Sequence, residues 1–284
     1  MYVWSTYKYN KKEGYTIMPE LNLETQQQNA LQFVQSLSLP APSNEMVLTA
    51  AQGPLKVLST PEAGAAVDDQ SIVCFVGGLN DQLRSDVLNS TLLAQLAASA
   101  KFPKDPNNFQ YNVAGWYNCY TDTLQKVGWN IQGLSFSQHQ VSGSTFQVNE
   151  VVMQLLASIA TNNAAMIVKS ALEALDATKA KQSQAITLWK SHTDNDANGS
   201  FQVSCCSETN GCAAMALGAF YLTGKNNSKH ILWFDFSSSD TKVQCASTQV
   251  VLNNDIYSTV RNAVVQKLGN AATSFVADLD IGDV

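Results

Sequence analysis

The stretch SFQVSCCSETNGCAAMALGAFYLT, residues 200–223, decides the fold class. Its first part, residues 200–207, alternates apolar and polar side chains, which is the pattern of a strand with one buried face. Asn210-Gly211 is the strongest short signal for a tight β-hairpin turn. Residues 212–223 are apolar at nearly every position, which indicates a central strand covered on both faces. The stretch therefore predicts a hairpin inside a mostly antiparallel sheet.

The chain on either side of this hairpin supplies helices and further strands. Residues 147–160 and 164–175 are two apolar runs at helical spacing, and they predict a helical hairpin with a wide apolar face. That helical pair either covers the sheet or swings away to lie on a bilayer. A third helix is expected over 179–191. After the β-hairpin, residues 230–236 and 242–252 read as strands, and 254–268 as an amphipathic helix.

The N-terminal half repeats the same mixture. Strands are expected at 71–77 and 128–141, and helices at 19–38, 82–100 and 110–126. The predicted fold class is therefore α/β of the α+β type, with a mostly antiparallel sheet sandwiched between layers of helices.

No linker or repeat divides the sequence. We expect residues 18–284 to form a single domain, preceded by a mobile N-terminal arm at residues 1–17. That N-terminus lacks an apolar signal-peptide core, so we expect a cytoplasmic protein or one secreted by a non-Sec route. No run of about 18 apolar residues is present that would commit a helix to spanning a membrane.

The composition excludes some partners. Only 14% of the 284 residues are charged and the net charge is −6, whereas a typical domain has about 25% charged residues. Nucleic acid is therefore not an expected partner, because its binders present basic surfaces. Simple polybasic docking on anionic membranes is disfavoured for the same reason.

Metal and nucleotide chemistry find little support. Residues 194–199 (DNDANG) match the first half of an EF-hand loop, but the twelfth position, which should be Glu, is Cys205. We interpret this segment as a polar turn. His139, His192 and His230 are scattered, and no Walker loop or Rossmann fingerprint occurs. We therefore expect no metal and no nucleotide cofactor.

Three cysteines of the hairpin, Cys205, Cys206 and Cys212, are the sharper candidates. Thiols this close in sequence could be inert core residues, form a bridge, bind a soft metal or carry a fatty acyl thioester. The alanine-rich strand after Cys212 leaves room that either helix side chains or a lipid chain must fill. Small neighbours favour Cys212 as an attachment site.

The alternation of the first strand separates the other two thiols. Cys206 shares a strand face with Gln202 and Ser204, and on that ground we expect it to be accessible. Cys205 shares its face with Phe201 and Val203, and we expect it to be more buried.

Residues 148–268 resemble the Cyt-like cytolysin fold in the order of their elements. The thiol-bearing hairpin CCSETNGC, residues 205–212, together with length and acidity, is most similar to the Erwinia virulence factor group. This resemblance implies an antiparallel sheet between helical layers and a virulence protein that associates with lipid membranes. It also implies a fatty acyl group, such as palmitoyl, on one of the hairpin cysteines. The host target and any oligomerisation on membranes stay open.

Three other functions remain in competition with this non-catalytic membrane association. A thiol-dependent hydrolase or acyltransferase would need a histidine beside the nucleophile, and His230 is the best candidate. The resemblance also admits a pore-forming cytolysin, although no clear protease-sensitive prosegment follows residues 1–17. An inert carrier module would bind a ligand without membrane affinity.

Overall fold

The computed structural model describes residues 22–41, 55–59, 62–103, 112–140, 143–177, 183–193, 199–224, 232 and 235–282. Its helical elements are α1 (Leu23–Ser36), η1 (Lys56–Leu58), α3 (Asp81–Lys101), α4 (Val113–Lys126), α5 (Val148–Ala157), α6 (Asn162–Ala177), α7 (Gln184–Thr193), α8 (Asn254–Leu268) and α9 (Ala271–Ser274). Its strands are β1 (Gly64–Asp68), β2 (Ser71–Phe75), β3 (Ser137–Gln138), β4 (Thr145–Phe146), β5 (Ser200–Thr209), β6 (Cys212–Gly224), β7 (Phe236–Ser237), β8 (Thr241–Val251) and β9 (Val276–Leu279).

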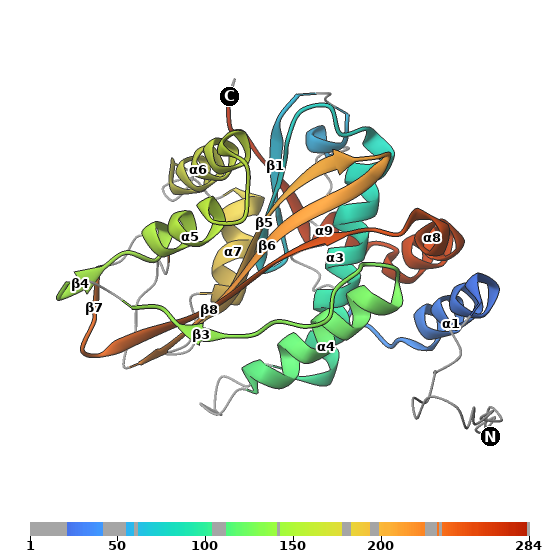
Figure 1. Ribbon diagram of the computed structural model, residues 1–284, viewed down its shortest axis with the longest axis horizontal. Helices are drawn as coiled ribbons and strands as arrows, with labels where there is room; N and C mark the ends of the chain where they lie inside the picture. The colour runs from blue at the N-terminus through green and yellow to red at the C-terminus, as the bar shows by residue number, and fades with distance from the viewer. Residues whose placement is uncertain are drawn as a thin grey trace, which may run out of the picture.

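The main sheet has the strand order β3-β8-β6-β5-β2-β1-β9. Neighbouring strands are antiparallel except for β2 and β5, which are parallel. Helices lie on both sides of this sheet, with α5, α6 and α7 on one side and α3, α4 and α8 on the other (Figure 1). The predicted α+β class, a mostly antiparallel sheet between helical layers, is confirmed.

The β5–β6 hairpin forms the centre of the sheet as the sequence predicts. Its turn places Asn210 at φ 52° and Gly211 at φ 76°, and positive φ at both central residues is the requirement of a type I′ turn. Thr209 faces Cys212 across the turn, and the pairing continues to Ser200 and Tyr221. This long register fixes which side chains of the hairpin face each helical layer.

Contacts identify the two faces of the hairpin. Phe201 on β5 packs edge-on against Trp189 of α7, with ring centroids 5.4 Å apart. Gln202 and the other even-numbered residues of β5 face α4. The side chain of Gln202 donates a hydrogen bond to the hydroxyl of Tyr117 on that helix at 3.0 Å. Cys205 therefore belongs to the α5–α7 face and Cys206 to the α3–α4 face, because side chains alternate along a strand.

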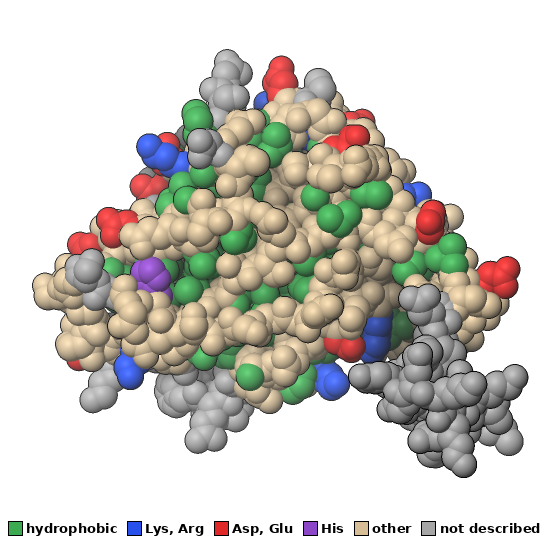
Figure 2. Space-filling model, viewed as in Figure 1, with side chains coloured by type: hydrophobic (Ala, Val, Ile, Leu, Met, Phe, Trp, Pro, Cys, Tyr) green, Lys and Arg blue, Asp and Glu red, His purple; other side chains and the backbone are tan. Residues whose placement is uncertain are grey.

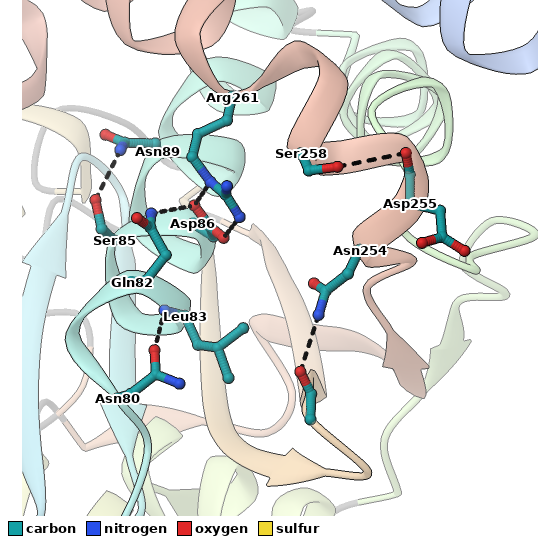
Figure 3. A network of polar contacts seen from close by, with 11 residues as sticks. Asn80, Gln82, Leu83, Ser85, Asp86, Asn89, Asn254, Asp255, Ser258 and Arg261 are labelled. Atoms are coloured by element: carbon teal, nitrogen blue, oxygen red, sulfur yellow. Dashed lines mark hydrogen bonds and ion pairs between the residues drawn. The ribbon is translucent and has the colours of Figure 1, made fainter. Parts of the chain in front are cut away.

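A paired charge joins the two helices α3 and α8. Arg261 donates two hydrogen bonds to the carboxylate of Asp86, from Nε to Oδ1 at 2.8 Å and from a terminal nitrogen to Oδ2 at 2.7 Å. Gln82 donates a further bond to Oδ1 at 2.9 Å (Figure 3). The side chain of Asp86 is 1% exposed, so this carboxylate depends on these donors for the solvation that water no longer gives.

Two predicted strands need correction. Within 128–141 only Ser137–Gln138 pairs with β8 as a strand, and Gly128 and Gly133 both take φ 115°, a conformation that breaks an extended strand. Of 230–236, the structure describes residues 232, 235 and 236, and Phe236 belongs to β7, which pairs with β4 in a separate small sheet. The predicted arm at residues 1–17 and the EF-hand-like residues 194–198 lie outside the described residues.

Candidate functional site: the hairpin thiols and the hollow beside Cys212

Cys205 lies beneath the α5–α7 layer and is 4% exposed. Its partner across the parallel strand pair is Cys74 of β2, in direct register. Burial raises the pKa of Cys205 to about 12, and burial followed by the two neighbouring thiols raises the pKa of Cys74. Both groups are therefore protonated and inert at neutral pH. All six cysteines are free thiols.

Cys206 is fully buried, with 0% exposure, and the expectation that it is accessible is wrong. It lies opposite Phe75 on one side and Met215 on the other. Burial raises the pKa of this thiol, and the nearby Cys205 raises it further. The thiolate needed for acyl transfer is therefore suppressed at Cys206 while the helical layer covers it.

A buried polar network explains why the polar face of β5 misled the prediction. The Gln202 side chain accepts a hydrogen bond from Ser71 at 2.9 Å and donates one to Tyr117 at 3.0 Å. The Tyr117 hydroxyl is directed at the carbonyl oxygens of Phe201 at 2.9 Å and Phe220 at 3.0 Å. Because these partners satisfy its polar atoms, the face can be buried without the cost of lost water contacts.

Cys212 differs from the other two, because it is only partly buried. It opens β6 directly after the turn and lines a surface hollow of about 530 Å³. The hollow forms where the start of β6, the end of β8, the start of α8 and the residues after α4 meet. Its lining is mixed, with an apolar part formed by Trp129, Val251, Leu252 and Ile256 and a polar part formed by Gln125, Asn130, Asn253, Asn254 and Asp255. Val251 is 40% exposed, so apolar surface continues from the hollow onto the outside.

Hydrogen bonds to the backbone hold the walls of this hollow together. The backbone N–H of Asn130 donates to the carbonyl of Val251 at 3.0 Å, and the backbone N–H of Asn253 donates to the carbonyl of Gly128 at 2.9 Å. The side-chain nitrogen of Asn254 donates to the carbonyl of Gly211 in the hairpin turn at 2.9 Å (Figure 3). The hollow is thus a built part of the fold, and it carries a cysteine at its rim.

Large side chains fill the space beside Gly218, one of the small residues of β6. A Cβ placed on Gly218 would lie 3.0 Å from the ring of Phe220 and 3.3 Å from Leu156 of α5. At Gly218, therefore, side chains of α5 and of β6 itself occupy the room.

No assembled catalytic or metal centre is found in the part of the chain that the structure describes. No group of three or more His, Cys, Asp or Glu side chains there could hold a metal ion. His139 is described, whereas His230 and the side chain of His192 lie outside the described residues. The proposed thiol–histidine pair with His230 thus stays a prediction. Among the described helices, none is long and apolar enough to cross a bilayer.

Sequence reasoning left Cys206, Cys212 and Cys205 all open as attachment sites, and it missed the hollow that Cys212 lines. The hollow combines segments that are distant in sequence, namely residues 125–130, 212 and 251–256. One local signal was present, because Gly128 has a positive φ and a Cβ there would lie 3.2 Å from the carbonyl oxygen of Asn253. A glycine at such a close approach marks where two segments meet.

No protein-family model matches the chain, and no curated protein does. Among solved structures, that of the Evf virulence factor is similar over 84% of this chain and 93% of its own, with 12% identity and a TM-score of 0.34. A delta-endotoxin structure is similar over 63% of this chain and 79% of its own, with 13% identity and a TM-score of 0.30. The first belongs to the virulence factor group that the hairpin sequence resembles.

Proposed function

We propose that this protein is a virulence-type protein that associates with lipid membranes through a fatty acyl chain on Cys212, without catalytic turnover. The observation that carries the proposal is the contrast among the three hairpin thiols. Cys205 and Cys206 are buried and their pKa values are raised, whereas Cys212 is partly exposed at the rim of a hollow whose lining is partly apolar.

The modification is an ordinary transthioesterification. The sulfur of Cys212 attacks the carbonyl carbon of an acyl thioester donor such as an acyl-coenzyme A. A new carbon–sulfur bond forms, the donor's thiolate leaves, and the proton lost from Cys212 goes to that thiolate. Only a thiol that a donor can reach in the folded protein can react in this way, which favours Cys212 over its two neighbours.

A single myristoyl chain binds a bilayer only marginally, with an association constant of about 10⁴ M⁻¹, and stable anchoring by one chain takes a second signal. A second contact is therefore needed, and the exposed Val251 beside the same hollow supplies apolar surface for it. Electrostatic attraction is not the second contact, since the net charge is −6. The face in Figure 2 agrees, because its few charged side chains are scattered mainly towards the edges.

The first test is the intact mass of the purified protein before and after neutral hydroxylamine, which cleaves thioesters. We expect an acyl mass excess that hydroxylamine removes and that Cys212→Ser abolishes. Cys119→Ser is the matched control, because Cys119 is also a partly buried free thiol but lies on α4. An unmodified parent mass would refute acylation, and an excess that survives in Cys212→Ser would refute the assignment to this residue.

The second test is flotation with phosphatidylcholine vesicles. We expect the acylated parent to float, and Cys212→Ser or Val251→Asp to float less. Because the protein is acidic, adding anionic lipid should not improve binding. Equal flotation of the parent and both variants would contradict membrane association at this hollow.

The thiols support the enzyme hypothesis less well than they support acylation. A nucleophilic cysteine needs a depressed pKa or an adjacent base, whereas burial raises the pKa values of Cys205 and Cys206. If the thiols were catalytic, the purified protein would hydrolyse acyl thioesters over many turnovers, and His230→Ala would abolish that activity. We expect at most one acyl transfer per molecule and no effect of His230→Ala on it.

A further inference from the structure

Asp68 is a buried acid at the end of β1, and no counter-ion faces it among the described residues. Its side chain is 0% exposed. One carboxyl oxygen, Oδ2, accepts a hydrogen bond from the hydroxyl of Thr91 on α3 at 2.5 Å. The other oxygen, Oδ1, has no hydrogen-bond partner in the described part of the chain. A buried carboxylate with one donor is costly, so the neutral acid is the form that this environment favours.

The described groups around Asp68 offer no positive charge. From α3 it meets Thr91 and Gln95, whose amide nitrogen donates to the Asp68 carbonyl at 2.9 Å. From the β1–β2 turn it meets Asp69, which raises the pKa of Asp68 further after burial has done so. From α4 it meets Tyr120, a buried phenol.

Arg84 on α3 and Arg261 on α8 are positively charged, but both bind groups other than Asp68. The Arg84 guanidinium donates to the backbone carbonyls of Leu79 and Val57 at 2.9 and 2.8 Å. Arg261 is held by the carboxylate of Asp86. Neither of these two cations is directed at Asp68.

We propose that protonated Asp68 is a latch that holds the β1–β2 hairpin to α3, and that its ionisation loosens the α3–α4 layer from the sheet. The latch lies at the contact of β1 with α3, where Thr91 and Gln95 both reach back to the same residue. Ionisation would leave a buried negative charge beside Asp69 with one donor. This inference concerns the fold itself and does not depend on acylation of Cys212.

The direction of the pH effect follows from linkage. The pKa of Asp68 is raised above its ordinary value of 3.8, so the folded state holds a proton that the unfolded state has released. The stabilisation is complete below that ordinary value and is lost as pH rises through the folded pKa. Within this window one proton changes the folding equilibrium constant by up to about tenfold per pH unit.

Cys206 offers a reporter for the latch. It lies on the α3–α4 face of β5, and Tyr120 is close to both groups, because Asp68 and Cys206 each raise the pKa of this phenol after burial does. Opening this layer should expose Cys206 while Cys205, on the other face of the same strand, stays covered. The two thiols are therefore a matched pair that differs in the face they occupy.

The experiment measures alkylation by iodoacetamide in two single-cysteine proteins that retain Cys206 or Cys205, each with the native Asp68 and with the substitution Asp68→Asn. Rates are compared from mildly acidic to alkaline pH. At each pH the rate in the protein with the native acid is divided by the rate in its Asp68→Asn counterpart, which cancels the thiol's own ionisation. We expect this ratio at Cys206 to rise by up to about tenfold per pH unit above the ordinary value of 3.8 and to level off once the acid is ionised in the folded protein as well, and to stay constant at Cys205.

Thr91→Val supplies a second variant. The Thr91 bond lowers the pKa of Asp68 in the folded protein, so its loss should move the pH at which the ratio at Cys206 levels off to a higher value without removing the rise. At mildly acidic pH, above the ordinary pKa of 3.8, an infrared carbonyl band of a protonated carboxylic acid should be present in the parent and lost in Asp68→Asn. A constant ratio at Cys206, an equal rise at both thiols, or the absence of that band would overturn the latch.

Discussion

Replacing Arg261 by Met tests how much the α3–α8 clamp contributes to stability. The change removes the two charge-assisted hydrogen bonds to Asp86 at 2.8 and 2.7 Å and leaves Gln82 as a donor. Removing one partner of a buried ion pair costs about 3–5 kcal/mol, because the other charge stays buried and unpaired. Since Arg261 is 28% exposed, water reaches part of the pair, and we expect the lower end, about 3 kcal/mol.

The assay is urea denaturation at neutral pH, with the free energy of unfolding compared between parent and variants. Asp86→Asn in the Arg261→Met background should recover part of the loss, because it removes the unpaired charge. The control is Asp122→Asn, which breaks the Asp122–Lys126 pair. Its atoms are also 2.7 Å apart, but its side chains are 52% and 45% exposed, so we expect a loss of no more than about 0.5 kcal/mol.

Equal losses in Arg261→Met and Asp122→Asn would refute the reasoning, because burial would then have no effect on the strength of an ion pair. A loss below about 1 kcal/mol in Arg261→Met would refute it too, since that is the range of exposed pairs. The double variant with Arg261→Met and Asp86→Asn distinguishes the loss of the ion pair from poor packing of the new Met side chain. If the Met side chain merely packs badly against α3, Asp86→Asn will not recover stability.

Three further predictions concern strand β6, helix α3 and the hairpin thiols. Gly218→Ala should cost about 1–3 kcal/mol of unfolding free energy, because its Cβ would lie 3.0 Å from the Phe220 ring and 3.3 Å from Leu156; the same change should cost less in a Leu156→Ala background, which is itself destabilised but leaves room. Arg84→Lys should cost roughly 3 kcal/mol, since a lysine cannot reproduce the planar fork that reaches separate carbonyls, and urea titration measures it. Iodoacetamide at neutral pH should modify Cys212 well before Cys205, whose pKa is raised to about 12; equal rates in peptide mapping would contradict the assigned burial.

The elements that the sequence predicts best are those whose signals are local. The Asn-Gly turn specifies the β5–β6 hairpin, and the apolar spacing within Asn254–Leu268 predicts α8. β9, Val276–Leu279, was missed because it is a short strand whose reason to be extended is its pairing with β1, about 210 residues earlier in the chain. Pairing over such a separation has no signature in the strand itself.

The candidate site divides in the same way. Alternation correctly separates Cys205 and Cys206 onto opposite faces of β5, because a strand has a period of two. Alternation cannot predict what covers each face of the strand. Gln202, a polar neighbour of Cys206, is buried because Tyr117 and Ser71, from other elements, form hydrogen bonds with its side chain. Small neighbours favoured Cys212 without deciding among the three thiols, because its distinguishing feature is the hollow, which forms only where segments distant in sequence meet.

The hairpin thus holds thiols of the same chemistry in three different environments, and the environment decides what each can do. Cys205 is covered by a layer that the latch at Asp68 does not touch, so its reactivity should be low at every pH at which the protein is folded. Cys206 should become reactive only when ionisation of Asp68 loosens the other layer. Cys212 is reachable without any opening. An acyl chain found on Cys212 in protein kept at acidic pH, with none on Cys206, would follow from this order. A chain found on Cys206 under those conditions would show instead that acylation precedes the packing of α3 and α4 on the sheet.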